Sequence, residues 1–330
     1  MKKNLIALCF LILTIGVNGQ CWQEWEKTKP GNKLTSLTST SNNELWGIAP
    51  GNSVWRWESD KWVNRNPGNK LISLTSIGSE LWGISPSNSV WRWESDKWVS
   101  RNPGNKLVEI FSFHPPRGLA KNGSMWEWDG KDWINNYKGN FFKTFFDFNW
   151  AIAPDNSVWK LEKNGWVNRN PGNKLKSISS ASGKQGNKWG IAPGNSVWRW
   201  EGEEWKNTNP GNKLTWIFSN IGLSPSGTMW KFDSSSKKWL RANEYNIPIK
   251  KFISLSGGAC AVPNVSFALS LDNRLIYKEG TNDYKYVNLP NVKLTQFAGI
   301  YLKDSKVKLF AIDEDYQVWS TTCPCTTIIH

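Results

Sequence analysis

Residues 44–75 read ELWGIAPGNSVWRWESDKWVNRNPGNKLISLT, and nearly the same sequence follows at residues 80–111. Self-similarity at a fixed period is the signature of a repeat architecture. The unit has a Trp-like position followed nine residues later by an apolar position that is usually Trp. Eight pairs keep this spacing, and their second members anchor the copies: Trp46/Trp55, Trp82/Trp91, Arg117/Trp126, Trp150/Trp159, Trp189/Trp198, Ile221/Trp230, Phe267/Ile276 and Phe310/Trp319.

Each copy contains four short strand-like runs, which in the second copy cover 70–76, 80–85, 89–94 and 97–101, with turn-forming residues between them. Apolar residues recur in the first run: Leu34, Leu71, Leu107, Phe142, Leu175, Leu214, Phe252 and Leu294, then three residues later Leu37, Leu74, Ile110, Phe145, Ile178, Ile217, Leu255 and Phe297. Four short strands every 35–45 residues or so describe one blade of a β-propeller. The pattern predicts an all-β protein, a closed propeller of eight four-stranded antiparallel blades, with a linear solenoid as the alternative.

The two ends of the repeat array are offset. The chain begins with a fourth-strand segment, Trp22–Trp25, and ends with a third strand at Trp319. We therefore expect the N-terminal strand to complete the last blade, which closes the ring and covers both sheet edges. A solenoid does not explain this offset. Cys21 and Cys323 or Cys325 flank the junction, which predicts a disulfide there and leaves Cys260 without an assigned partner.

Residues 1–19 resemble a secretory signal, with Lys2 and Lys3 ahead of an apolar run and small residues before Gln20. A membrane anchor is one alternative, but the apolar run has only about 13 residues and ~20 are needed to span a bilayer. A lipoprotein is another, because Cys21 follows closely, although Gln20 is a poor residue before a lipidated cysteine. We expect a secreted, extracellular protein in which residues 20–330 form a single propeller domain.

Composition narrows the functional classes. Hydrophobic residues make up 39% of the chain and charged residues 21%, which excludes a disordered protein and a membrane bundle. Lys and Arg number 41 against 27 Asp and Glu, a net charge of +14, or +12 (39 against 27) without Lys2 and Lys3. This excess predicts an anionic partner. The histidines are His114 and His330, which offer little for acid–base chemistry or metal binding, and we expect neither a metal nor a cofactor.

The repeated sequence ELWGIAPGNSVWRWESDKWVNRNPGNKL resembles the tectonin repeat, with its LWG strand, its N-x-V-W-R strand and a final Trp before a Gly-containing loop. The resemblance spans residues 22–320. It implies a non-enzymatic lectin that binds bacterial lipopolysaccharide or related surface glycans at several equivalent sites. Known closed members of this family have six blades, whereas this chain has eight units.

A lysine precedes the innermost strand of seven units. These residues are Lys33, Lys70, Lys106, Lys174, Lys213, Lys251 and Lys293, with Phe141 in the remaining unit. Innermost strands line the central channel, so we expect a ring of ammonium groups around its mouth that concentrates anions. The structural alternative is that these lysines are solvated residues at strand starts, copied by duplication.

The third strands carry Arg-Trp pairs, and the turns before them carry asparagine. We expect these residues to form shallow glycan sites, because an aromatic face beside Arg and amide groups suits a sugar ring. The candidates are Arg56, Trp57, Arg92, Trp93, Trp128, Arg199, Trp200, Asn52, Asn88 and Asn195. The structural alternative is packing in the outer layer of the blades.

The main functional prediction is a secreted lectin that engages microbial or cell-surface glycans by avidity in recognition, agglutination or innate defence. The alternative is a protein-docking or matrix propeller without sugar specificity. We expect no enzymatic activity, because the sequence has no nucleophile elbow, zinc spacing or phosphate-binding loop. Nucleic-acid binding fits the charge but has no supporting motif. Asn122 and Asn264 lie in glycosylation sequons.

Overall fold

Turn residues divide each copy of the repeat into four antiparallel strands. In the first copy, Glu58 pairs with Lys61 across a two-residue turn in which Ser59 and Asp60 have φ of 45° and 60°. Two residues of positive φ make the hairpin turn whose twist matches that of the flanking strands. The preceding hairpin reverses at Asn52, which has φ of 63°. The copies therefore fold as up-and-down sheets.

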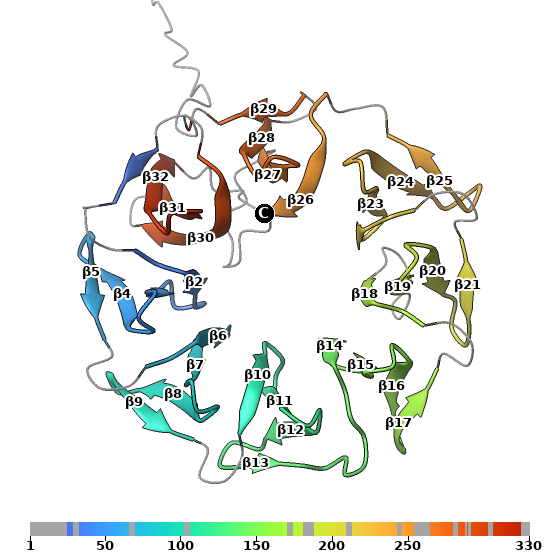
Figure 1. Ribbon diagram of the computed structural model, residues 1–330, viewed down its shortest axis with the longest axis horizontal. Coiled ribbons are helices and arrows are strands. Elements are labelled where there is room, and N and C mark those ends of the chain that lie inside the picture. Colours follow the sequence, from blue (N-terminus) through green and yellow to red (C-terminus); the bar gives the residue numbers. More distant parts are fainter. Residues whose placement is uncertain are drawn as a thin grey trace, which may run out of the picture.

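The structure, a computed structural model, describes residues 25–28, 33–65, 70–101, 106–169, 174–180, 188–208, 213–242, 246–253, 265–279, 283–287, 289, 292–302 and 306–324. These residues form eight four-stranded antiparallel sheets arranged as the blades of a closed ring (Figure 1). The chain is thus an eight-bladed β-propeller, as predicted. The described residues contain no helix, and so none long and apolar enough to cross a membrane.

Within a blade the first strand lies at the channel and the fourth at the rim (Figure 1). Blades 1 to 4 consist, from the inside outward, of β2 (Ser36–Ser39), β3 (Leu45–Ile48), β4 (Val54–Glu58) and β5 (Lys61–Asn64); β6 (Ser73–Ile77), β7 (Glu80–Ile84), β8 (Val90–Glu94) and β9 (Lys97–Ser100); β10 (Leu107–Phe111), β11 (Arg117–Ala120), β12 (Met125–Trp128) and β13 (Trp133–Ile134); and β14 (Thr144–Asp147), β15 (Trp150–Ile152), β16 (Val158–Glu162) and β17 (Gly165–Asn168).

The other four blades follow the same order. Blades 5 to 8 consist of β18 (Ser177–Ser180), β19 (Lys188–Ile191), β20 (Val197–Trp200) and β21 (Trp205–Asn207); β22 (Trp216–Phe218), β23 (Ile221–Leu223), β24 (Met229–Asp233) and β25 (Lys238–Arg241); β26 (Ile249–Ile253), β27 (Val265–Ser270), β28 (Leu275–Glu279) and β29 (Lys285–Tyr286); and β30 (Leu294–Leu302), β31 (Lys306–Asp313), β32 (Val318–Pro324) and β1 (Glu26–Lys27).

The eighth blade joins the two ends of the chain, which confirms the predicted closure. β1 pairs with β32 as the outermost strand, with Glu26 opposite Ser320. The N–H of Thr28 extends the pairing with a bond of 2.8 Å to the carbonyl oxygen of Val318. The described pairing covers Glu26 and Lys27, and residues 22–24 of the predicted segment lie outside the described residues. Trp25 instead packs edge-on against Phe297 of the inner strand β30, with ring centroids 5.4 Å apart.

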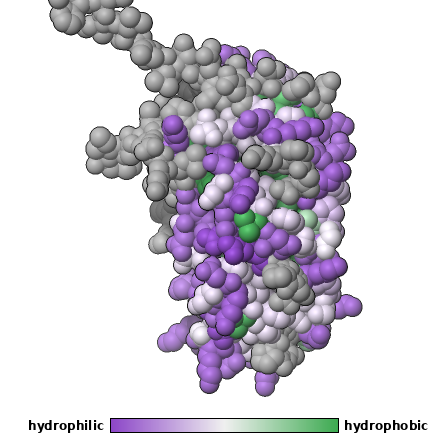
Figure 2. All heavy atoms as spheres, turned by 90° about the vertical axis from the view of Figure 1, so that its left-hand side faces the viewer, coloured by the Kyte–Doolittle hydropathy of each residue, from purple (hydrophilic) through white to green (hydrophobic). Residues whose placement is uncertain are grey.

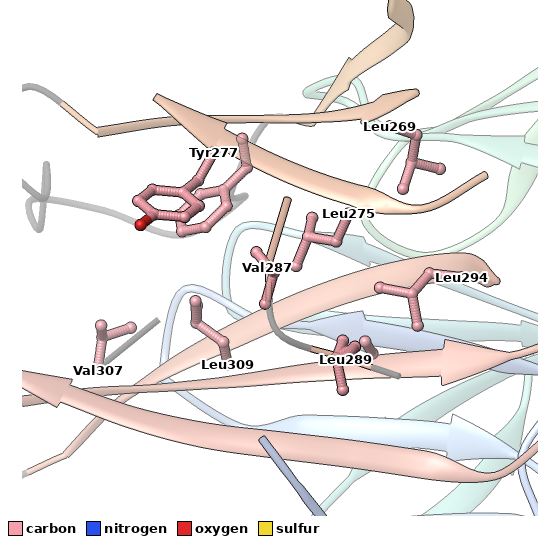
Figure 3. Packing of buried hydrophobic residues seen from close by; sticks show 10 residues of the cluster. Leu269, Leu275, Tyr277, Val287, Leu289, Leu294, Val307 and Leu309 are labelled. Atoms are coloured by element: carbon pink, nitrogen blue, oxygen red, sulfur yellow. The ribbon is translucent and has the colours of Figure 1, made fainter. Parts of the chain in front are cut away.

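Aromatic residues fill the wedges between neighbouring blades. Trp82 of blade 2 is fully buried and meets Trp128 and Trp133 of blade 3 edge-on, with centroids 5.2 Å and 5.5 Å away. Such pairs add stabilisation beyond the area they bury. Between blades 7 and 8 the core is mainly aliphatic, as Figure 3 shows. The abundance of tryptophan is therefore largely explained by packing, as expected from the repeat.

The glycine of the LWG sequence makes room for the leucine of the inner strand. A Cβ on Gly83 would lie 2.4 Å from Cδ1 of Leu71, a distance that real contacts do not reach. Gly47 stands in the same relation to Leu34, at 2.6 Å. This close approach accounts for a Gly in the middle of a buried strand.

Blade 7 departs from the predicted alignment. The N–H of Ile249 bonds to the carbonyl oxygen of Gly227, and Phe252 pairs with Ala268 as Leu37 pairs with Gly47. Ile249, not Phe252, is therefore the counterpart of Leu34, and the assignment of Phe252 and Leu255 was wrong by three residues. The alignment from sequence placed Phe252 at this position because Lys-Phe at 251–252 resembles the Lys-Leu pair of the other copies.

Candidate functional site

The predicted lysine ring lies beside the turns that join the second and third strands. Each lysine precedes a residue whose N–H bonds to the turn of the previous blade, as Leu107 does to Asn88. Lys106 reaches back so that its Nζ donates to the carbonyl oxygen of Ser87 at 3.1 Å. The ring members in this position are exposed: Lys33, Lys70, Lys106, Lys174, Lys213 and Lys293.

Lys251 is not a member of this ring. The shifted register of blade 7 places Pro248 immediately before Ile249, at the position that Lys70 occupies before Leu71. Lys251 instead follows two residues after Ile249 and pairs with Leu269. In blade 4 the position is held by Phe141, which is 51% exposed, as expected from the sequence.

Both blades without a ring lysine carry one two residues further along. Lys143 and Lys250 occupy this second position, and Lys176 of blade 5 occupies it as well. Lys176 and Lys250 contact the turns of the same face: Lys176 Nζ lies 2.5 Å from Asn195 Oδ1, and Lys250 Nζ lies 2.5 Å from Asn273 Oδ1. Lys143 follows Phe142 as Lys176 follows Leu175, and it is exposed. The sequence already showed Lys143 and Lys176 at this position, since each follows the aligned residue Phe142 or Leu175, whereas Lys250 depended on a blade 7 alignment that only the hydrogen bonds fix.

We call this surface the lysine face. It consists of nine exposed lysines, of which every blade supplies at least one: Lys33, Lys70, Lys106, Lys143, Lys174, Lys176, Lys213, Lys250 and Lys293.

Carboxylates neutralise the lysine face only in part. Lys174 Nζ lies 2.9 Å from Asp155 Oδ2, and Lys293 Nζ lies 3.7 Å from Glu314 Oε2. Hydrogen bonds from Ser157 and Lys174 hold the pKa of Asp155 well below its usual range. Among the described residues, no carboxylate lies within ion-pair distance of the remaining lysines of the face, Lys33, Lys70, Lys106, Lys143, Lys176, Lys213 and Lys250.

The arginines that end the fourth strands do not add to this charge. Arg65 donates through Nε and Nη2 to both carboxylate oxygens of Glu58, at 2.7 Å and 2.5 Å. Arg101 pairs with Glu94 in the same bidentate way, and the bonds of these two arginines lower the pKa of Glu58 and of Glu94. These guanidinium groups are thus occupied along the outer strands.

The arginines predicted to bind glycans lie toward the opposite face, where each covers an aromatic wedge. Arg56 bonds to Glu44 at 2.8 Å and lies 5.4 Å from the ring of Trp46. Arg92 repeats this with Glu80 at 2.7 Å and Trp82 at 5.3 Å. Cation–π contacts and ion pairs therefore already use most of the donors of these side chains.

Arg199 is the third arginine of this group. It lies 5.5 Å from the ring of Trp189 and 5.1 Å from that of Phe232, and its nearest carboxylate, Glu201, is 3.8 Å away. Its Nε is buried without a hydrogen-bond partner. The group thus stabilises the wedge mainly through its position over the two rings.

The tryptophans predicted as sugar platforms belong to the wedges. Trp128 and Trp200 are 5% and 2% exposed, so neither offers an open ring face, and their assignment to a glycan site was wrong. Trp57 and Trp93 are half-buried and meet Phe310 and Trp46 of the preceding blade. Both faces of a blade are covered by neighbours in a closed ring, which is why strand position alone did not identify a surface residue.

The predicted asparagines shape the turns. Asn52, Asn88 and Asn195 have φ of 63°, 64° and 66°, which asparagine tolerates better than most residues. Their carbonyl oxygens accept the N–H of the first inner residue of the next blade. Their side chains lie on the lysine face, where the Oδ1 of Asn195 already accepts from Lys176.

Several predicted features lie outside the described residues: the signal segment 1–19, Cys21, Cys260, Cys325 and Asn264. For Cys323 only the backbone is described, in β32, so the disulfide is untested. Asn122 is exposed in a turn, and its Oδ1 accepts from Ser124. No group of three or more potential metal ligands occurs in the described part of the chain.

The rim of the ring is largely hydrophilic where blades 8, 1 and 2 form it. Figure 2 views blades 8, 1 and 2 from outside and shows hydrophobic residues as separate small areas among polar ones. Contiguous apolar patches are what mark an interaction surface, and none spreads across this view. The visible rim of these three blades therefore gives no candidate for an apolar docking site.

Comparison with known proteins shows the fold. No family model and no curated protein matches the chain. Similar solved structures include the computationally designed protein Ika8 (14% identity, TM-score 0.57, covering 90% of this chain and 98% of that one) and YCF48 bound to D1 peptide (9%, 0.52, 93% and 96%). YCF48 from Cyanidioschyzon merolae is similar as well (10%, 0.51, 90% and 98%). At these identities the likeness extends to the propeller architecture alone.

Proposed function

We propose that this propeller is a docking protein whose lysine face binds an acidic segment of a partner protein. The observation that carries the proposal is that every blade supplies an exposed lysine next to the start of its inner strand, six of them directly before its first residue and blades 4 and 7 two residues further along. Like charges arranged in a ring repel one another, and an anionic partner relieves that repulsion. Such a ring also speeds association with a negatively charged surface.

The surroundings of the face support this function. The opposite face carries carboxylates at the turns between the third and fourth strands of the first six blades, for example Glu58, Asp96 and Asp233, and these offset lysines at the same turns such as Lys61 and Lys97. A propeller of the same architecture, YCF48, has been solved with a peptide bound. We infer that the present chain likewise acts by binding and has no catalytic role. The sequence offers no nucleophile elbow, zinc spacing or phosphate-binding loop that would favour catalysis.

Charge reversal on one face tests the proposal. Lys70→Glu with Lys106→Glu should weaken binding of a peptide of alternating Glu and Asp about tenfold or more, because each change replaces attraction by repulsion. The matched control is Lys61→Glu with Lys97→Glu, two exposed lysines at the turns of the opposite face. Equal weakening by both pairs, or no weakening by either, would contradict a role for the lysine face.

Recognition of anionic glycans is the second candidate, and the tectonin-like repeat favours it. We propose in this case a secreted lectin for lipopolysaccharide or related surface glycans, exported through the leader-like residues 1–19. Eight equivalent weak contacts can together exceed the affinity of one by ~10²–10⁴. The polar contacts would come from the lysine face and the turn residues Asn52 and Asn88, because Trp128 and Trp200 are buried.

Titration at two salt concentrations separates the candidates. Raising salt from about 0.1 M to about 0.5 M shortens the screening length from about 10 Å to about 4 Å. An acidic peptide that binds at low salt and is released at high salt supports protein docking. Lipopolysaccharide binding that persists at high salt, together with discrete preferences on a glycan array and no binding of the acidic peptide, would assign the protein to the lectins instead.

A further inference from the structure

A cavity opens between the inner strands of blades 7 and 8. It has a volume of about 310 Å³, and its walls include Lys251 and Phe252 of β26 and Gln296 and Phe297 of β30. Pockets that bind small ligands in proteins begin at about this size. Lys251 lies outside the lysine face, so this cavity is separate from the proposed docking surface.

The floor of the cavity is apolar. Leu269 and Leu294 line it from the core between the two blades, where they are 3% and 2% exposed. Figure 3 shows both leucines at one end of this core. Phe252 adds a ring that is held by Trp216, with centroids 5.3 Å apart. A hydrophobic group of a ligand would therefore meet aliphatic and aromatic carbon atoms.

The polar side of this cavity differs from the equivalent place at the junction of blades 8 and 1. At the junction of blades 8 and 1, Gln296 Oε1 accepts the N–H of Leu37 at 2.9 Å, so an acceptor covers the open inner edge of β2. Lys251 holds in blade 7 the position of Gln296 in blade 8, because the two pair with the matching residues Leu269 and Ile312.

Phe297 holds in blade 8 the position of Leu37, since Phe297 pairs with Ala311 as Leu37 pairs with Gly47. Its N–H therefore also points to the open inner edge of the blade. A lysine is a donor only and offers this N–H no acceptor. No carboxylate of the described residues forms an ion pair with Lys251. Two donors, one of them cationic, thus line the same cavity above an apolar floor.

We propose that the cavity binds a small hydrophobic monocarboxylate. Its carboxylate lies between the Lys251 ammonium group and the Phe297 N–H, and its aliphatic or aromatic part contacts Leu269, Leu294 and Phe252. Charge-assisted hydrogen bonds are about twice as strong as neutral ones, so the carboxylate provides the selectivity and the apolar part adds affinity. The ligand supplies the acceptor that Gln296 supplies at the next junction.

The test uses 3-phenylpropionate and its uncharged analogue 3-phenylpropionamide in calorimetric titrations of the full chain. We expect saturable binding of the acid, with the amide at least tenfold weaker. Lys251→Gln should weaken the acid at least tenfold, because it removes the charge and places an acceptor where Gln296 has one. Lys250→Gln is the matched control and should leave binding within twofold, since its ammonium group bonds to Asn273 on the lysine face.

Three results would overturn the proposal: no saturation by about 10 mM acid, a limit of very weak affinity; equal binding of acid and amide; or equal losses in the Lys251 and Lys250 variants. A short peptide ending in phenylalanine distinguishes the source of the carboxylate, and tighter binding of that peptide than of the free acid would exclude a small-molecule ligand. Lys251→Gln should leave binding of the acidic peptide to the lysine face unchanged. A failure of the cavity proposal can therefore be distinguished from a failure of the docking function.

Discussion

The backbone N–H of Leu34 donates a hydrogen bond of 3.0 Å to the carbonyl oxygen of Tyr316. This bond joins the first blade to the last across almost the whole chain, and it has the same form as the bond at each of the other junctions. The corresponding pairs, donor first, are Leu71 with Asn52, Leu107 with Asn88, Phe142 with Gly123, Leu175 with Asn156, Leu214 with Asn195, Ile249 with Gly227 and Leu294 with Asn273. Ring closure therefore uses the contact that the repeat already provides.

Because residues 25–28 close the ring, we expect them to contribute strongly to the stability of the whole propeller. Removal of residues 1–28 takes away β1, the bonds of Thr28 to Val318 and the packing of Trp25 on Phe297. We expect a loss of about 2–4 kcal/mol in unfolding free energy, from lost packing and hydrogen bonds, and self-association through the uncovered edge of β32. Urea unfolding and sedimentation measure the two effects.

The matched control for this deletion removes residues 1–24 and keeps β1 and Trp25, and all three proteins are unfolded with a reductant present so that the predicted disulfide of Cys21 does not contribute. It should stay monomeric and unfold at nearly the same urea concentration as the full chain. If both deletions behave alike, the N-terminal strand does not hold the ring closed.

Trp128→Ala tests whether this side chain belongs to the wedge or to a surface. Its ring is 5% exposed and lies 5.2 Å from that of Trp82, so truncation should cost about 3–5 kcal/mol of unfolding free energy. Phe218→Ala is the control, because Phe218 is 63% exposed and its removal should cost less than about 0.5 kcal/mol. Near-normal stability of Trp128→Ala, measured by urea unfolding, would show that the ring contributes little to the core.

Much of the fold could be predicted from the sequence because the repeat is nearly uniform where turns are formed. Asn52 and Ser59-Asp60 reverse the chain at fixed places, and the apolar spacing between them then sets the strands. The prediction failed in blade 7, where the junction lacks the Pro-Gly-Asn-Lys sequence and only the bond of Ile249 to Gly227 fixes the register. Local pattern determines a strand more reliably than its alignment with distant copies.

The candidate site was harder to predict, because alternation along a strand does not say which side of a blade is covered. Trp57 and Trp128 stand at equivalent places, and both contact the preceding blade. Exposure of the ring lysines followed directly from their position before the inner strand. Lys250 was missed because its equivalence with Lys176 depends on the hydrogen bond of Ile249 to Gly227, whereas Lys143 follows Phe142 as Lys176 follows Leu175 and could have been found from the sequence.

Acid should destabilise the protein through its outer ion pairs. Bonds from Arg65 and Arg101 lower the pKa of Glu58 and of Glu94, so the folded state prefers both carboxylates ionised. Their stabilisation is complete above the ordinary carboxyl pKa of about 4.3 and is lost as pH falls toward the lowered values. The variant Glu58→Gln with Glu94→Gln should melt about 2 °C lower than the parent at pH 6.

The difference between these two proteins should shrink as pH falls from about 5 to 3, where the parent carboxylates become protonated. Thermal melts followed by circular dichroism across this range provide the measurement. Melting temperatures that stay a constant distance apart at every pH would show that the two pairs do not contribute through their charge.

Blade 3 replaces both partners of the cross-strand pair found in blade 1. Where Trp46 pairs with Arg56 across two strands, Arg117 pairs with Glu127, and the Arg117 side chain is 1% exposed. Its Nε lies 2.9 Å from Glu127 Oε2, and its guanidinium group lies 3.9 Å from the ring of Phe148. Because the cation is buried, its stability depends on this one carboxylate and on Phe148.

This double replacement predicts strong coupling between positions 117 and 127. Glu127→Arg alone brings two guanidinium groups together and should cost about 3–5 kcal/mol. Arg117→Trp alone leaves Glu127 without its cation and should also destabilise the protein. The double variant restores the pair found in blade 1, so we expect its stability to lie within about 1 kcal/mol of the parent. A double variant that loses the sum of the two single losses in urea unfolding would mean that the positions act independently and that the repeat pair does not fit this wedge.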